Sequence, residues 1–185
     1  MNYYKKYKPY FFLLHAVAVL ILFFFIPFFK TFGLSFFDYS SSIYNPTFNG
    51  VDNYIKLFKE PIFYKVMFNT FMYLIIAVPF LVTFPLFLAI LINQKIRGIT
   101  LYKILLYLPV IVSIVVAAIA FKWLYAGQGI LNYILTLFHL DPIGWLVDTK
   151  WALFSVAIVT IWKGIGYYMM IYLASLMSVP QDLYE

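Results

Sequence analysis

Long runs of apolar residues alternate with short polar clusters along this chain. Uncharged runs of 21, 29 and 18 residues lie between Lys8 and Lys30, between Lys65 and Lys95, and between Lys103 and Lys122. A fourth run, residues 151–177, is interrupted only by Lys163. Because the hydrocarbon core of a membrane is about 30 Å thick, roughly 20 apolar residues in a helix cross it. Each run therefore predicts a membrane-spanning helix.

The pattern predicts an all-α fold, a polytopic membrane helix bundle with about four transmembrane helices and short interfacial helices. We treat residues 1–185 as a single transmembrane domain. Prolines 79 and 85 predict bending within the second span. The segment NYIKLF (53–58) predicts a short interfacial helix, and residues 126–150 predict a surface helix along the membrane. We place the spans at 10–37, 66–92, 101–125 and 151–178, separated by the tail 1–9, the loops 38–65, 93–100 and 126–150, and the end segment 179–185.

Composition agrees with this pattern. Hydrophobic residues make up 65% of the chain and charged residues 11%, with a mean hydropathy of +0.92, which excludes an ordinary soluble domain. A cleaved signal peptide is the competing interpretation of the first run, but the run is too long and aromatic and lacks a small-x-small cleavage pattern. The net charge of +6 is spread along the chain, so we expect no nucleic-acid partner. The absence of cysteine excludes disulfides and thiolate metal sites.

The distribution of basic residues predicts the orientation. The tail carries Lys5, Lys6 and Lys8, and the short loop before the third span carries Lys95 and Arg97, in both cases without an acidic residue. The other two loops are longer and mix lysines with aspartate and glutamate. Lys and Arg near membrane ends favour the cytoplasmic side. The N-terminus is therefore predicted to be cytoplasmic.

No arrangement of residues predicts catalysis or metal binding. His15 and His139 lie on different segments without neighbouring ligands, so His15 is interpreted as a packed or interface-facing side chain, with a proton relay as the alternative. Ser113 and Ser155 lack a nucleophile motif, and helix packing is the favoured role for both. The chain also lacks a phosphate-binding glycine loop. Any energy from a nucleotide must therefore come from a partner protein.

Four polar residues within spans are candidates for a pathway. An ammonium near a helix centre costs about 2.5 to 3.5 kcal/mol on insertion scales, so Lys163 must find a carboxylate, backbone carbonyls or water. Three roles are open to Lys163: it lines a pathway, it pairs within the assembly, or its side chain extends to a lipid headgroup. Gly164 and Gly166 beside it allow another backbone to approach. Asn69 and Tyr73, like Lys163 and Tyr167, share one helix face at i and i+4. Each pair lines a pathway or forms interhelical hydrogen bonds.

Several segments together resemble the sugar-permease branch of type I ABC importers, a MetI-like transmembrane domain that works with an extracytoplasmic binding protein. The resemblance covers nearly the whole chain and rests on the order and spacing of residues 50–73, 93–109, 127–135 and 144–185. It implies an incomplete MetI-like permease fold that ends just after the start of the cytoplasmic coupling segment. That segment would dock onto an ATPase through Pro180, Gln181, Asp182, Leu183, Tyr184 and Glu185.

The resemblance implies a membrane permease subunit that carries a carbohydrate or related polar solute by alternating access. The chain itself would bind no cofactor and be no enzyme, since two partner ATPase subunits would use the ATP. The other implied partners are a second permease subunit, an extracytoplasmic solute-binding protein and membrane lipid, in the cytoplasmic (inner) membrane of a bacterium. The alternative is a non-transporting scaffold or sensor-anchor helix bundle. An intramembrane enzyme is disfavoured because the spans hold no paired carboxylates or histidine cluster.

Overall fold

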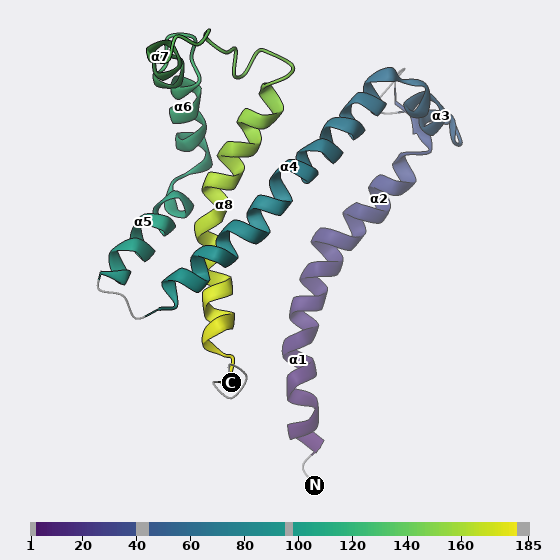
Figure 1. Cartoon of the computed structure of the whole chain (residues 1–185). Coiled ribbons are helices and arrows are strands. Elements are labelled where there is room, and N and C mark those ends of the chain that lie inside the picture. The colour runs from purple at the N-terminus through teal and green to yellow at the C-terminus, as the bar shows by residue number, and fades with distance from the viewer. Residues whose placement is uncertain (1–2, 40–44, 95–97, 181–185) are drawn as a thin grey trace. The chain divides into compact units, whose positions relative to one another are not determined.

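The computed structural model describes residues 3–39, 45–94 and 98–180, with side chains from Tyr10 onward. Most of the described chain is helical, and its strands are only two residues long, which confirms the predicted all-α class (Figure 1). Contacts divide the chain into two units, Met1–Lys65 and Val66–Glu185. The elements are α1 (Tyr3–Leu20), the π-helix η1 (Ile21–Phe25), α2 (Ile26–Leu34), β1 (Phe37–Asp38), β2 (Thr47–Phe48), α3 (Asp52–Lys59), α4 (Pro61–Ile92), α5 (Ile99–Ile111), α6 (Ile114–Leu124), α7 (Ile130–Leu137) and α8 (Ala152–Met177).

The first span of the sequence is built by α1, η1 and α2 in succession. Residues Tyr10–Leu34 form a helical stretch long and apolar enough to cross a membrane, and its side chains are exposed, as expected for a surface that lipid covers. The π-helical turn directly precedes Pro27, which has no N–H to donate to the preceding turn. The helix ends at Leu34, whereas the sequence predicted a span to Phe37.

Hydrogen bonds from α3 explain this earlier end. The Asn53 side-chain amide donates to the carbonyl oxygens of Ser35 (2.9 Å) and Phe37 (3.0 Å), and the hydroxyls of Ser35 and Tyr54 lie 2.6 Å apart. These contacts hold the turn at Ser35 and Phe36, after which Phe37 pairs with Phe48 in the short antiparallel ladder of β1 and β2. The predicted helix at 53–58 is thus confirmed as α3, and its polar side chains fasten it to the end of the first span.

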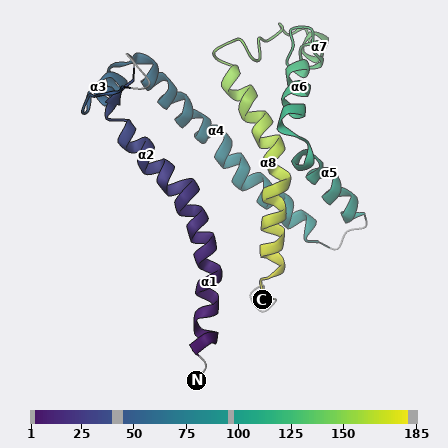
Figure 2. The same ribbon diagram turned by 180° about the vertical axis from the view of Figure 1, so that it is seen from behind.

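The second unit is organised around α8. Three helices of the described chain are long and apolar enough to cross a membrane, or four if α5 and α6 count as one span. Helix α4 stays one helix through Pro79 and Pro85. Its C-terminal half packs on α8 through a buried cluster of Ala89, Ile92, Met169 and Leu173. Figures 1 and 2 both show α5 and α6 alongside α8.

The third span, predicted at 101–125, is two helices that meet at 95°. Helix α5 ends at Ile111, and Val112 is extended, with φ −63° and ψ 130°. Ser113 then caps α6, since its hydroxyl accepts from the N–H of Val115 at 3.3 Å. This capping bond, which the helix-packing interpretation of Ser113 did not include, supplies a physical reason for the restart. The prediction of one continuous span is therefore wrong, and the span is broken at Val112.

A buried asparagine organises the segment between α6 and α8, where α7 is the predicted surface helix. The Asn132 side chain is 2% exposed. Its amide nitrogen contacts the carbonyl oxygens of Ala126, Gly127 and Ile143 at 3.0–3.2 Å, and its carbonyl oxygen accepts from the Ile143 N–H and the Trp145 indole N–H, both at 2.9 Å. A single side chain thus joins the chain before α7 to the chain after it.

Candidate functional site

Lys163, on α8, binds the end of α5. Its ammonium nitrogen lies 2.6 Å from the carbonyl oxygen of Val112, 3.3 Å from that of Val110 and 3.4 Å from that of Pro109. The side chain is half-buried. Backbone carbonyls were one of the three kinds of partner that the sequence analysis required for this lysine.

The break in the third span is what makes these carbonyls available. The last carbonyl groups of an α-helix have no partner within the helix, and they carry the negative end of its dipole. In α5 they would bond to the next helical turn if the span continued, but the chain turns by 95° instead. An ammonium is well suited to this position because it offers three donors and a positive charge. Lys163 therefore stabilises the broken conformation of the span.

Gly166 brings the backbones of α8 and α5 into contact one turn after Lys163. A Cβ atom at Gly166 would lie 2.2 Å from the carbonyl oxygen of Leu106, a distance at which the helices must separate. At Gly164 a Cβ would instead meet the Leu81 side chain at 2.6 Å, and a flexible side chain can move aside. The expected close approach of another backbone is thus found at Gly166.

A hydrogen bond also joins α4 to α8. The Tyr73 hydroxyl donates to the hydroxyl oxygen of Thr160 at 2.6 Å, and the Thr160 hydroxyl lies 3.2 Å from the carbonyl oxygen of Val156 in its own helix. This geometry matches the interhelical alternative for Tyr73. Its predicted companion Asn69 is exposed, and Asn69 makes no side-chain hydrogen bond within the part of the chain that the structure describes.

Tyr167 differs from Lys163, its neighbour one turn away. It is 51% exposed, and its ring packs edge-on against Tyr168 with the ring centroids 5.4 Å apart. The structure therefore divides the four predicted pathway residues by environment. Tyr73 and Lys163 contact neighbouring helices, whereas Asn69 and Tyr167 present polar groups on exposed surfaces.

Only the beginning of the predicted coupling segment is described. Helix α8 ends at Met177, the N–H of Ser178 bonds back to the carbonyl oxygens of Ser175 and Leu176, and Pro180 is exposed just beyond. Because the residue before a proline is disfavoured in helical conformation, Pro180 accounts for the end of the helix. The remaining predicted coupling residues lie outside the described residues: Gln181, Asp182, Leu183, Tyr184 and Glu185.

The other candidates fall into simple environments. His15 is exposed on α1. Ser155 is fully buried on α8, which agrees with the predicted packing role, and its hydroxyl lacks a hydrogen-bond partner within the described residues. Among residues 3–39, 45–94 and 98–180, no group of three or more histidine, aspartate or glutamate side chains could hold a metal ion.

Sequence reasoning missed three residues with clear structural roles: Asn132, Thr160 and Ser113. Each is a polar residue in an apolar setting, and the same signal drew attention to Lys163. The partner of Thr160 lies across a helix interface, and the partners of Asn132 are mostly backbone groups of the chain before and after α7, so neither spacing nor periodicity indicates them. For Ser113, a serine directly before an apolar helical run is a recognised N-cap signal that was available in the sequence.

Comparisons with known proteins extend over almost the whole chain. The probable ABC transporter permease protein YurN of Bacillus subtilis (strain 168) is 36% identical over 186 residues, covering 98% of this chain and 63% of YurN. The lactose transport system permease protein LacF of Rhizobium radiobacter is 31% identical over 173 residues, covering 92% of this chain and 57% of LacF. The chain thus spans less than two thirds of either relative. No protein-family model matches it.

A solved structure shares the fold. A bacterial ABC transporter involved in the import of the acidic polysaccharide alginate superposes with a TM-score of 0.79 at 25% sequence identity, over 98% of this chain and 63% of that one. A second alginate ABC transporter structure, in complex with a periplasmic protein bound to an alginate pentasaccharide, gives a TM-score of 0.77 at 24% identity and supports the fold alone.

Proposed function

Since this chain belongs to the sugar-type permease subunits of ABC importers, we propose that it forms part of the pathway along which an ATP-driven importer moves a carbohydrate or related polar solute. The observation that carries the proposal is the similarity to YurN, 36% identity over 98% of the chain. The TM-score of 0.79 to an alginate importer supports it independently of sequence identity. Transport proceeds by alternating access, with the chain as one wall of the pathway.

Of the four candidate residues in this pathway, Asn69 and Tyr167 are the preferred contacts for the solute. Both side chains are exposed, and both offer hydrogen-bonding groups to a solute rich in hydroxyls. Tyr73 and Lys163 are less suited to this role, because each would have to leave an existing hydrogen-bond partner to bind the solute. Their present bonds support a role in holding α4, α5 and α8 together.

The proposed energy source is ATP hydrolysis by separate subunits, so the chain is no enzyme and binds no cofactor of its own. One of two ATPase subunits would dock on the segment from Pro180 to Glu185, where Leu183 and Tyr184 supply apolar contact and α8 transmits the movement. The end of α8 at Met177 and the exposed Pro180 support this assignment, because the helix ends before the segment begins.

The complete importer would hold a second permease subunit and an extracytoplasmic solute-binding protein in the cytoplasmic membrane of a bacterium. The basic residues of the tail and of the loop between α4 and α5 support a cytoplasmic N-terminus. An even number of spans, with α5 and α6 counted as one, returns the coupling segment to the same side. The ATPase subunits would then meet it in the compartment that holds ATP.

The test is transport by the full-length permease in proteoliposomes, with its partner permease, ATPases and binding protein, using a panel of labelled mono- and oligosaccharides. We expect ATP-dependent uptake of at least one sugar. The double variant Leu183→Ala with Tyr184→Ala should abolish binding-protein-stimulated ATP hydrolysis and uptake together. The matched control, Tyr10→Ala with Leu14→Ala, removes the same residue types from an exposed face of α1 and should leave both rates unchanged. Normal coupling in the first variant would contradict the docking role, and ATP-independent uptake or none would contradict the proposed function.

A further inference from the structure

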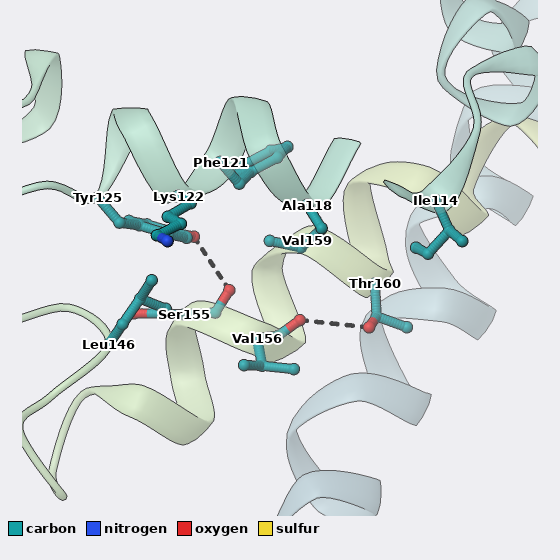
Figure 3. A pocket seen from close by; sticks show the side chains of 10 residues that line it. All are labelled: Ile114, Ala118, Phe121, Lys122, Tyr125, Leu146, Ser155, Val156, Val159 and Thr160. Atoms are coloured by element: carbon teal, nitrogen blue, oxygen red, sulfur yellow. Dashed lines mark hydrogen bonds between the residues drawn. The ribbon is translucent and has the colours of Figure 1, made fainter. Parts of the chain in front are cut away.

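A groove of about 400 Å³ lies between α6, α8 and the segment that precedes α8 (Figure 3). Its volume falls within the range of about 300 to 1,000 Å³ that is typical of sites for small ligands. Most of its lining is aliphatic or aromatic, which suits a hydrocarbon ligand and offers little to a solute rich in hydroxyls. The lining residues are Ile114, Ala118, Phe121, Lys122, Tyr125, Leu146, Ser155, Val156, Val159 and Thr160.

The groove runs along α6 for a distance that matches one half of a bilayer. Figure 3 shows Ile114 and Thr160 at one end, and Lys122, Tyr125 and Leu146 at the other. With a rise of 1.5 Å per residue, the helix from Ile114 to Lys122 extends about 12 Å. Half of the hydrocarbon core is about 15 Å thick. An acyl chain lying along the groove would therefore remain within one leaflet.

The end of the groove at Lys122 has the composition of a membrane interface. Trp123 is 75% exposed beside it, and Trp145 and Trp151 pack edge-on nearby, with ring centroids 5.7 Å apart. Tryptophan is enriched where lipid headgroups meet the hydrocarbon. Lys122 lies in the last turn of α6, is exposed, and makes no hydrogen bond or ion pair within the described part of the chain. Its ammonium is therefore available to an anion at the level of lipid phosphates.

A second polar group in the groove also lacks a partner. The Ser155 hydroxyl is buried, and no described residue hydrogen-bonds to it. The neighbouring Tyr125 hydroxyl does not satisfy it, because that hydroxyl donates to the Ser155 backbone carbonyl at 3.0 Å. A buried unpaired hydroxyl costs about 1–3 kcal/mol. Ester oxygens just below a phospholipid headgroup are acceptors that would pair with it.

We infer that this groove binds one acyl chain of a phospholipid whose anionic headgroup lies at Lys122 and whose ester oxygen accepts from Ser155. This lipid site requires that the chain lies in a membrane, and it does not require that the chain transports a solute. A packed helix from a protein would fill the apolar part equally well, but it would pair with the Lys122 ammonium only if it carried an acidic side chain at that level, whereas every anionic phospholipid carries its charge there. Charge complementarity at this end therefore selects the lipid.

The test uses full-length protein purified in detergent, stripped of lipid and supplied with phosphatidylglycerol that carries a photoreactive diazirine on one acyl chain. After irradiation, peptide mapping should place adducts on residues 114–125 and 155–160. Phosphatidylcholine with the same label should be captured less, because it carries no net charge. Lys122→Gln should lower capture of phosphatidylglycerol about fivefold and remove its advantage over phosphatidylcholine.

Two alanines of α6 provide a matched pair of variants. Ala118 lines the groove, whereas Ala120 is equally an exposed alanine of α6 but does not line it. Ala118→Phe should fill the groove and abolish the adducts, and Ala120→Phe should leave them unchanged. The inference is overturned if both variants are labelled alike or if adducts map elsewhere. It is also overturned if Lys122→Gln keeps the preference for phosphatidylglycerol, or if the groove labels only an adjacent protein segment.

Discussion

Replacement of Lys163 by methionine tests the most specific contact in the structure, because methionine keeps an unbranched apolar side chain and loses the ammonium. The bond to Val112 is short, at 2.6 Å, and those to Val110 and Pro109 are long, at 3.3 and 3.4 Å. Interhelical hydrogen bonds in membranes average about 0.6 kcal/mol and reach about 1.7 kcal/mol. With the upper value for the short bond and the average for the two long ones, Lys163→Met should destabilise the contact between α5 and α8 by about 3 kcal/mol.

The assay is reversible unfolding of the protein in mixed micelles by increasing mole fractions of sodium dodecyl sulfate, followed by circular dichroism. Lys65→Met is the matched control, because Lys65 is an exposed lysine of α4 with no bond to the described residues, and the free energy of unfolding of this variant should change by less than about 0.5 kcal/mol. The insertion cost of the charge largely cancels, since both states hold Lys163 within the micelle. If Lys163→Met unfolds within about 0.5 kcal/mol of the unmodified protein, the ammonium does not stabilise the break.

Three further predictions concern contacts within the second unit. Gly166→Ala should destabilise the protein by more than about 2 kcal/mol in the same assay, because a backbone carbonyl faces the new methyl group, whereas Gly164→Ala should cost less. Asn132→Leu should speed amide hydrogen exchange in residues 126–150 at least tenfold, since five hydrogen bonds are lost, and unchanged exchange would contradict its organising role. Tyr73→Phe and Thr160→Val in a double-mutant cycle should show a coupling energy of about 1 kcal/mol, and additive effects would mean that their bond contributes nothing.

The apolar runs were sufficient to predict the helices because a membrane demands long uncharged segments and satisfied backbone groups. Helix α8 and the end of α4 lie where apolar runs predicted them, whereas α4 begins at Pro61, before the predicted start at residue 66. Both short helices, α3 and α7, lie in the loops where they were expected. The requirement that Lys163 find backbone carbonyls or another partner also followed from its position in an apolar run. Which helix supplies those carbonyls depends on three-dimensional packing, which cannot be derived from a single sequence.

The break in the third span shows why local patterns were insufficient there. Pro109 lies within α5 and does not end it, whereas the restart depends on the Ser113 cap and on a lysine 51 residues beyond Val112. Because the residues on both sides of the break are apolar, a search for long apolar runs predicts one continuous span across it. The capping serine was the local signal, and its significance depends on the distant lysine that stabilises the free carbonyls.

The environments of the polar residues in α8 narrow the search for solute contacts. The Lys163 ammonium is a strong hydrogen-bond donor, yet it already contacts three carbonyl groups. A solute hydroxyl would have to compete with a charge-assisted contact that also stabilises the shape of the neighbouring span. Substitutions at Asn69 and Tyr167 should therefore change which sugar is carried without large effects on stability, whereas those at Lys163 should reduce stability first. Specificity and structural integrity would then depend on different residues one turn apart in the same helix.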